Sequence, residues 1–294
     1  MPSKMSLLAA VVLGVVTHAS AFAAGDEWQK VADALGKAGT ETTNGVYRVG
    51  FPRTDLKVLL DGVELKPALA LGSWLGFQPE QGQALVMGDL VLTAEEVSPV
   101  MQKLADDGIE ITALHNHLLR AVPATFYLHI RGLGDPVKLA TALHDALVLT
   151  QTPFAPATVP APDLEFDTAM IDTTLGAKGK TNGGVYQVSL RRAEPVSSDG
   201  MGVPDNMGSA ELINFQATGD GKVAISGDFA LTEKEINPVL RVLRKSGIEV
   251  TALHNHMLDE EPRLFFMHFW ANDALTKLVP GLKAALDLIN LERS

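Results

Sequence analysis

The sequence predicts an α+β fold made of two tandem copies of one domain, because its motifs occur twice at one spacing. Thr112–His117 (Thr-Ala-Leu-His-Asn-His) returns unchanged as Thr251–His256, 139 positions later. The same spacing relates Gly88-Asp89 to Gly227-Asp228. Solenoid repeats have periods of roughly 20–50 residues, so this much longer period indicates a duplicated domain.

Each copy is expected to be a largely antiparallel sheet with an αββα C-terminal part that carries the His-x-His strand. Asp61-Gly62 predicts a hairpin turn. Thr93 with Glu96, and Thr232 with Glu235, predict a helix capping box in each copy. The elements expected in the first copy are a helix at 28–37, strands at 46–51, 56–60, 63–65 and 84–92, a helix at 93–107, strands at 109–117 and 125–131, and a closing helix at 136–149.

The chain divides by composition into a leader, two copies and a linker. Residues 1–23 are typical of a signal peptide, with Lys4, an apolar run at 7–16 and a cleavage pattern at Ala21-Phe22-Ala23. The copies are then expected at 24–151 and 163–294. They are joined by a Pro/Ala linker at 152–162.

The leader predicts a periplasmic or secreted destination after cleavage near Ala23. The apolar run is shorter than the roughly 20 residues that span a membrane. The chain contains no cysteine, so we expect neither a lipid anchor nor a disulfide nor a thiolate metal site. The formal charge of −11 argues against nucleic acid as a partner, and the oligomeric state stays open.

Six of the eight histidines fall in two matching sets, which makes metal binding the leading hypothesis. Residues two apart on a strand share a face, and a turn centred near Pro123 would place His117 opposite His129, with Cβ atoms about 4.5–5.5 Å apart. Three histidines with an open position are the pattern of catalytic zinc sites. Zinc is the first expectation, and copper, nickel, iron and manganese are compatible with the same ligands. The predicted ligands are His115, His117, His129, His254, His256 and His268.

Other interpretations of the same residues stay open. The histidines could instead form structural hydrogen bonds that fix a hairpin, and the two sets could form two sites or one. Asp259, Glu260 and Glu261, which follow the second set, are candidates for a fourth ligand or a general base, or for a solvated turn. Asp89 and Asp228 follow glycine and are expected in turns.

Several motifs resemble those of the LppY/LpqO-type family of exported bacterial proteins. They are Gly-Asp-Leu-Val-Leu-Thr at 88–93, Glu-Val-Ser-Pro-Val-Met at 96–101, the segment 108–117 and Tyr-Leu-His-Ile-Arg-Gly at 127–132, with their second-copy counterparts. The resemblance covers nearly all of the mature chain. It implies tandem domains of unknown function outside the cytoplasm, and it carries no particular reaction. Known members include lipoproteins, but without cysteine the lipid anchor does not carry over to this chain.

These observations predict an exported protein that binds a divalent transition metal, with metal-dependent hydrolysis of an envelope or extracellular substrate as its candidate activity. The alternative is a non-catalytic envelope module that carries metal, or that binds a glycan or a protein partner while its histidines are structural. A carboxylate close to the histidines would favour the hydrolase.

Overall fold

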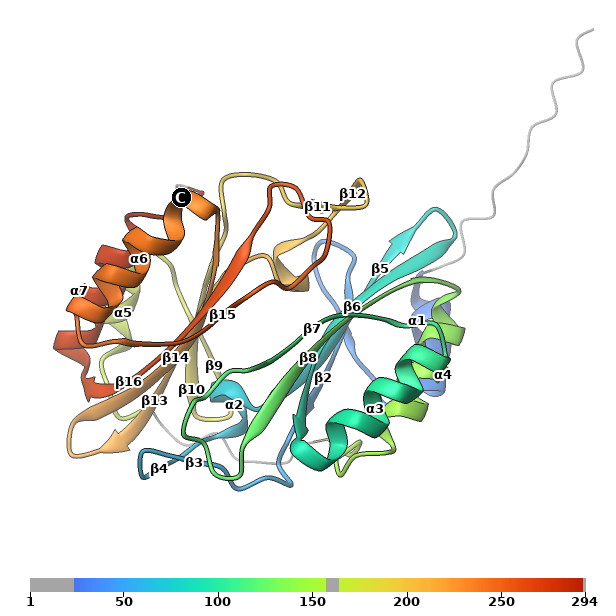
Figure 1. Ribbon diagram of the computed structural model, residues 1–294, viewed down its shortest axis with the longest axis horizontal. Helices are drawn as coiled ribbons and strands as arrows, with labels where there is room; N and C mark the ends of the chain where they lie inside the picture. Colours follow the sequence, from blue (N-terminus) through green and yellow to red (C-terminus); the bar gives the residue numbers. More distant parts are fainter. Residues whose placement is uncertain (1–23, 157–163, 293–294) are drawn as a thin grey trace, which may run out of the picture.

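The computed structural model describes residues 24–156 and 164–292. The predicted signal peptide, residues 157–162 of the predicted linker and residue 163 lie outside this part. Each copy forms a six-stranded antiparallel sheet, as predicted, and carries its three longer helices on one face. Helices α1, α3 and α4 lie on one outer side of the molecule and α5, α6 and α7 on the other, with the two sheets between them (Figure 1).

The first copy contains four helices and eight strands. Its sheet has the order β1-β2-β5-β6-β8-β7. The elements are α1 (Ala24–Leu35), β1 (Thr40–Glu41), β2 (Tyr47–Pro52), β3 (Leu59–Leu60), β4 (Val63–Glu64), α2 (Pro67–Ala70), β5 (Gly72–Glu80), β6 (Gln83–Thr93), α3 (Ala94–Asp106), β7 (Glu110–Asn116), β8 (Thr125–Gly134) and α4 (Pro136–Leu147).

The second copy repeats this arrangement, with the sheet order β15-β16-β14-β13-β10-β9. A 3-10 helix, η1, takes the place of α2. The elements are α5 (Thr168–Leu175), β9 (Lys180–Asn182), β10 (Val185–Leu190), β11 (Ser197–Ser198), β12 (Met201–Gly202), η1 (Asp205–Met207), β13 (Glu211–Gly219), β14 (Lys222–Leu231), α6 (Glu233–Lys245), β15 (Glu249–His254), β16 (Phe265–Ala274) and α7 (Leu275–Leu286).

The local signals in the sequence are confirmed. Glu96 accepts a hydrogen bond from the backbone N–H of Thr93 at 2.9 Å and so closes the capping box of α3. Asp61 and Gly62 have φ values of 49° and 83°, the left-handed conformations that a tight hairpin between β3 and β4 needs.

The two copies pack together through the helix-free faces of their sheets. Helix α2 lies against the second sheet, where the Asn214 side chain donates a hydrogen bond to the carbonyl of Leu69 at 2.8 Å. The segment η1 lies against the first sheet, where Arg48 donates to the carbonyl of Asn206. Because each copy covers part of the other's sheet, the copies form one interlocked body with apolar clusters that draw on both.

The hairpin tips and the edge strands make further contacts between the two copies. Asp61, at the β3–β4 tip, accepts from the indole N–H of Trp270, while Asp199, at the β11–β12 tip, pairs with Arg131 at 2.6 Å. The edge strand β7 meets the second copy where the Thr112 hydroxyl donates to the carbonyl of His256 at 2.7 Å. Asn255 also donates a hydrogen bond to the carbonyl of Thr112 there.

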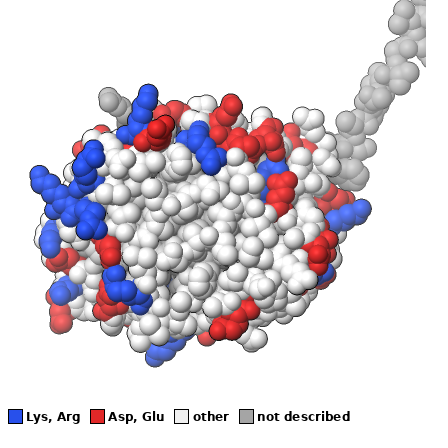
Figure 2. Space-filling view, viewed as in Figure 1, with Lys and Arg blue, Asp and Glu red and all other residues white. Residues whose placement is uncertain are grey.

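On the face viewed in Figure 1, charged side chains lie mainly around the periphery and few lie in the centre (Figure 2). The edge strands β7 and β15 contribute the exposed apolar side chains Leu114 and Leu253. Among the described helices, none combines the length and the apolar character needed to cross a membrane.

Candidate metal centre

The six predicted histidines come together in one cluster between the two sheets, here called the histidine cluster. Strand β8 carries His129 and β16 carries His268, both on the faces that meet between the copies. His115 and His254 lie at the ends of the edge strands β7 and β15, and their rings stack with centroids 3.5 Å apart. The duplication therefore builds one shared centre and not one centre per copy.

The predicted strand register is wrong. His129 lies opposite Ala113, and His115 lies opposite Tyr127. A β-bulge between Ile111 and Ala113 shifts the alternation of side chains, so Ile111 packs into the helix-side core while His115 faces the other copy. Because β7 ends at Asn116, His117 begins the following loop, and its side chain does not follow the alternation of the strand.

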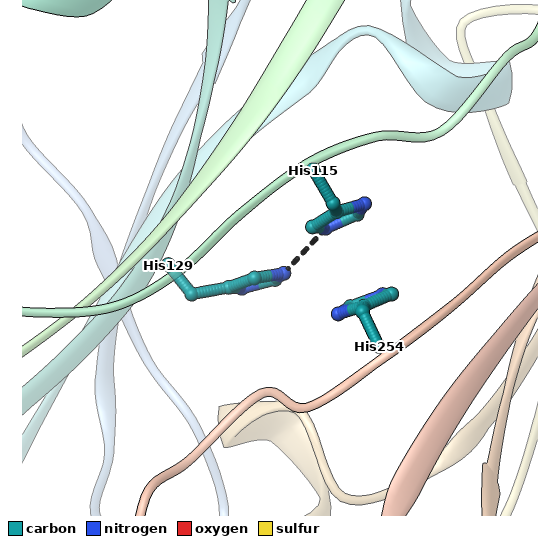
Figure 3. A group of neighbouring side chains, drawn as sticks. All are labelled: His115, His129 and His254. Carbon is teal, nitrogen blue, oxygen red and sulfur yellow. Dashed lines mark hydrogen bonds between the residues drawn. The ribbon is translucent and has the colours of Figure 1, made fainter.

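Four rings form the inner part of the cluster as two pairs. The Nε2 atoms of His115 and His129 are 2.9 Å apart, and those of His254 and His268 are 2.7 Å apart. The two pairs are stacked, with ring planes 10–19° apart across the contacts among these four residues. Figure 3 shows three of them, His115, His129 and His254, whose ligand nitrogens lie within 4.8 Å of one another.

In the second pair, the hydrogen bonds that the Nδ1–H groups donate to backbone carbonyls fix the tautomers of both rings. His254 donates from Nδ1 to the carbonyl of Asn255 at 2.7 Å, and His268 donates from Nδ1 to the carbonyl of Gly227 at 3.2 Å. Each neutral ring then carries its proton on Nδ1, so two Nε2 lone pairs face each other. In the first pair, His115 donates to the carbonyl of Asn116, whereas Nδ1 of His129 has no partner among the described residues.

The two remaining histidines cross between the copies. His117 packs against His268 with ring centroids 3.7 Å apart, and its Nε2 lies 3.1 Å from the hydroxyl of Ser226. His256 packs edge-on against His129 at 4.1 Å. Gly208, with a φ of 102°, leaves room for this ring, because a Cβ atom there would lie 2.4 Å from Nε2 of His256.

Burial lowers the pKa of every histidine in the cluster and so favours the neutral imidazole. The pKa falls to about 2 for His115, about 3 for His117 and His256 and about 4 for His254, because burial removes the rings from water. For His129 and His268 the pKa also lies well below the usual value for the same reason. Neutral imidazole is the form that binds metal ions.

Asp89 and Asp228 were expected in turns, and this prediction is wrong. Asp89 lies in the middle of β6, opposite His129, and Asp228 lies in the middle of β14, opposite His268. The preceding glycine is needed for packing: a Cβ at Gly227 would lie 2.3 Å from the ring of Phe269. The Asp228 carboxyl lies 3.6 Å from Nδ1 of His268, beyond hydrogen-bond distance, and the carbonyl of Gly227 is the acceptor that orients this ring.

Burial also raises the pKa of both aspartates, to about 8 for Asp89 and well above the usual range for Asp228. One oxygen of each carboxyl group is buried without a hydrogen-bond partner among the described residues. A carboxylic acid of this kind can hold a proton near neutral pH and transfer it to a reacting group.

A cavity of about 690 Å³, here called the central cavity, adjoins the histidine cluster. Both copies supply its walls, and four of the histidines face it: His117, His129, His256 and His268. The repeated Gly-Asp pair is the sequence signal that could have placed the aspartates here. Nothing in the local sequence marks Arg48, which also lines the cavity.

The remaining candidates lie away from the cavity. Asp259 accepts hydrogen bonds from Ser198 and Asp199, Glu260 accepts from the backbone of Leu264, and Glu261 forms a backbone bridge with Ser197. Their side chains therefore belong to the turn after the second His-x-His and do not line the cavity with the histidines.

The fold and the site together define a tandem-domain α+β protein with one histidine cluster between its copies. The chain belongs to the family described as Domain of Unknown Function (DUF1259), whose model matches residues 29–149 and 169–288. No curated protein matches the chain.

Two solved structures show a weak similarity. The trimeric bacterial microcompartment shell protein PduB is 11% identical over 88% of this chain and 97% of its own, with a TM-score of 0.23. EtuB from Clostridium kluyveri is 8% identical over 86% of this chain and 89% of its own, with a TM-score of 0.20. At these TM-scores the similarity supports no conclusion about this chain.

Proposed function

We propose that this chain is an exported, LppY/LpqO-like protein that binds one divalent transition metal ion, zinc first, in a centre shared by its two copies. We further propose that it is a metal-dependent hydrolase of a small envelope or extracellular molecule bound in the central cavity. The export signal at residues 1–23 and the family resemblance support the location. The histidine cluster supports the metal.

One observation carries the metal proposal: the Nε2 atoms of His254 and His268 face each other at 2.7 Å while both rings use Nδ1 as donor. Two lone pairs at this distance repel each other in a buried site. A proton or a metal ion between them removes the repulsion, and burial disfavours the extra proton. A divalent cation therefore suits this pair of nitrogens.

The spacing of the nitrogens suits zinc after a small adjustment. Two ligands at the usual zinc–nitrogen distance in a tetrahedral site are about 3.3 Å apart. The pairs at 2.7 Å and 2.9 Å need to open by only a few tenths of an ångström, which side-chain rotation supplies. His115, His129 and His254 already present nitrogens within 4.8 Å of one another, and His268 is the fourth candidate.

The surroundings support a hydrolytic activity. A divalent ion held here would supply a Lewis acid that polarises a carbonyl or phosphoryl oxygen. Asp228 has its carboxyl group beside His268 and lines the cavity, so it can exchange a proton with a bound substrate.

Elemental mass spectrometry of protein purified from the periplasm, without a nickel column, tests the metal. We expect one equivalent of metal per chain. Because the centre is shared, His115→Gln and His254→Gln should each remove nearly all of it. His144→Gln is the matched control, since His144 bonds to Leu35 outside the cluster. Loss of half the metal in each variant would indicate two separate sites, and metal-free protein that takes up no zinc would refute the centre.

A second set of measurements tests location and activity. Mass spectrometry of the mature N-terminus should show cleavage near Ala23, and intact protein in the cytosol would contradict export. A screen of ester, amide and phosphoester substrates with the metal-loaded protein should reveal an activity that Asp228→Asn reduces about 100-fold or more while metal stays bound. Metal binding with no hydrolysis would favour the non-catalytic metal carrier.

A further inference from the structure

We propose that the central cavity binds a small organic anion and that Arg48 holds its carboxylate or phosphate group. This inference rests on the proposed function, since it names the substrate class of the same cavity. Arg48 is the one cationic residue among those that line the cavity. The ligand would present its anionic group to the first-copy end and its uncharged part to the second-copy end.

The partners of Arg48 leave most of its guanidinium group available. Within the described chain, its hydrogen bonding is limited to one donation from Nη1 to the carbonyl of Asn206, and no carboxylate lies within ion-pair distance. Its guanidinium lies over the ring of Trp74, 4.1 Å from the centroid, which fixes the plane of the group. A guanidinium held in this way presents its free N–H groups for a bidentate contact with an anion.

The position of Arg48 connects it to the histidine cluster. The ring of Trp74 has both groups as neighbours: the guanidinium lies 4.1 Å from its centroid, and the ring of His256 lies nearly parallel to it with centroids 6.4 Å apart. Both Arg48 and His256 line the cavity. An anionic group on Arg48 therefore leaves the rest of a small ligand beside the histidines.

The second copy has no cationic residue at the position equivalent to Arg48, so this charge is specific to the first copy. Gln187 occupies the position equivalent to Arg48, and Leu212 occupies that of Trp74. The Gln187 side chain donates to Asn214 and to the carbonyl of Ala68 and presents no charge. The two ends of the cavity therefore differ, and this difference sets the orientation in which a ligand binds. The cavity volume of about 690 Å³ is in the usual range for small-molecule sites.

Burial makes the positive charge of Arg48 costly, and a bound anion would compensate that cost. Removal from water lowers the pKa of Arg48 to about 10, although the nearby Asp89 acts in the opposite direction. A buried cation without a full set of acceptors is costly, and stacking on Trp74 offsets only part of that cost.

Isothermal titration with benzoate and phenylphosphonate, each beside uncharged benzamide, tests the inference on the full mature chain. We use metal-free and zinc-loaded protein. Both anions should bind the metal-free wild type and benzamide should bind at least about tenfold more weakly. Arg48→Gln, which copies the second repeat, should weaken the anions about tenfold, and Arg48→Lys should retain part of the affinity. Arg263→Gln, a surface control, should change nothing.

Each outcome decides between the proposals. Anion binding that appears only with zinc and is unchanged in Arg48→Gln would overturn the role of Arg48 and leave the metal centre intact. Anion binding to a protein that takes up no zinc would keep this inference and refute the metal centre. If Arg48→Gln does not fold, the comparison of benzoate with benzamide on the wild type and on Arg48→Lys still decides. Equal binding of benzoate and benzamide, or binding of neither, would refute the inference.

Discussion

The two copies agree at the histidines and aspartates and differ in the walls around them. Asp89 and Asp228 occupy equivalent strand positions, each opposite the third histidine of its set. By contrast, Arg48 in the first copy corresponds to Gln187 in the second, and Tyr127 corresponds to Phe266. The shared residues form one cluster to which both copies contribute, and the unlike walls give the cavity two different ends.

A second difference lies behind the cavity wall. Ser73 accepts a hydrogen bond from the backbone N–H of Val91, and Glu211, the equivalent residue, accepts one from the N–H of Ala230. Both side chains are buried, but only Glu211 brings a carboxyl group. Arg192 lies 3.7 Å from it, so the second copy depends on this arginine more than the first depends on Arg53.

Removal of the buried arginines should expose this difference most strongly. Arg53→Met leaves Glu96 without its main partner, and Arg192→Met leaves both Glu235 and Glu211. Loss of one partner of a buried ion pair costs about 3–5 kcal/mol. Urea unfolding should show a loss in this range for Arg53→Met, and for Arg192→Met a loss that becomes the larger of the two as the pH rises and Glu211 ionises.

The control for this comparison is Glu211→Ser, which gives the second copy the residue of the first. Added to Arg192→Met, it should reduce the loss to that of Arg53→Met. Equal losses for the two single variants would show that Glu211 has no need of Arg192.

Zinc should stabilise the two copies together, because the proposed centre draws ligands from both. Zinc at about 100 times its dissociation constant would add about 2.7 kcal/mol, or a rise in the unfolding midpoint of about 5 °C. Calorimetry should show a single transition that shifts as a whole. His129→Gln and His268→Gln should abolish the shift equally, and a shift that survives in one of them would show that the copies bind zinc separately.

The pH dependence of stability should separate the copies further. Burial raises the pKa of Glu211 well above the usual range, against the influence of Arg192 and with that of Asp228 and Glu235. A raised pKa in the folded state means that the stabilisation is complete below the unfolded pKa of about 4.5 and is lost as the pH rises. Glu211→Ser should therefore gain stability relative to the wild type as the pH rises from 5 to 8. A constant difference across this range would contradict the buried carboxyl.

Much of the fold follows from local sequence signals. The capping residues Thr93 and Glu96 and the hairpin turn Asp61-Gly62 are decided by a few neighbouring residues, and all lie where they were predicted. The repeat reveals the duplication without any structural information, and it also identifies the histidines that gather in the cluster. The capping and hairpin signals depend only on residues that are a few positions apart in the chain.

The arrangement of the cluster depends on contacts that the sequence does not display. The bulge at Thr112 shifts the register of β7, and no local pattern marks it. Asp89 follows a glycine that resembles a turn residue, whereas that glycine is required because the backbone of Trp74 approaches to 2.7 Å from where its Cβ would lie. The convergence of both copies on one centre is a property of their packing, which strand patterns within one copy cannot reveal.

The smallest expected effect concerns one pair of equivalent threonines. Both Thr112 and Thr251 are buried, but Thr112 donates to the carbonyl of His256 at 2.7 Å, whereas the hydroxyl of Thr251 has no partner among the described residues. Thr112→Val should cost about 1 kcal/mol through the lost hydrogen bond and the carbonyl left without its donor. Thr251→Val should be neutral or slightly stabilising, since it removes a buried hydroxyl group that makes no hydrogen bond within the described residues. Urea unfolding of the two variants measures both values. Equal losses would mean that the contact between the edge strands is not formed in solution, and the shared histidine centre would then lose one of the bonds that hold His256 in place.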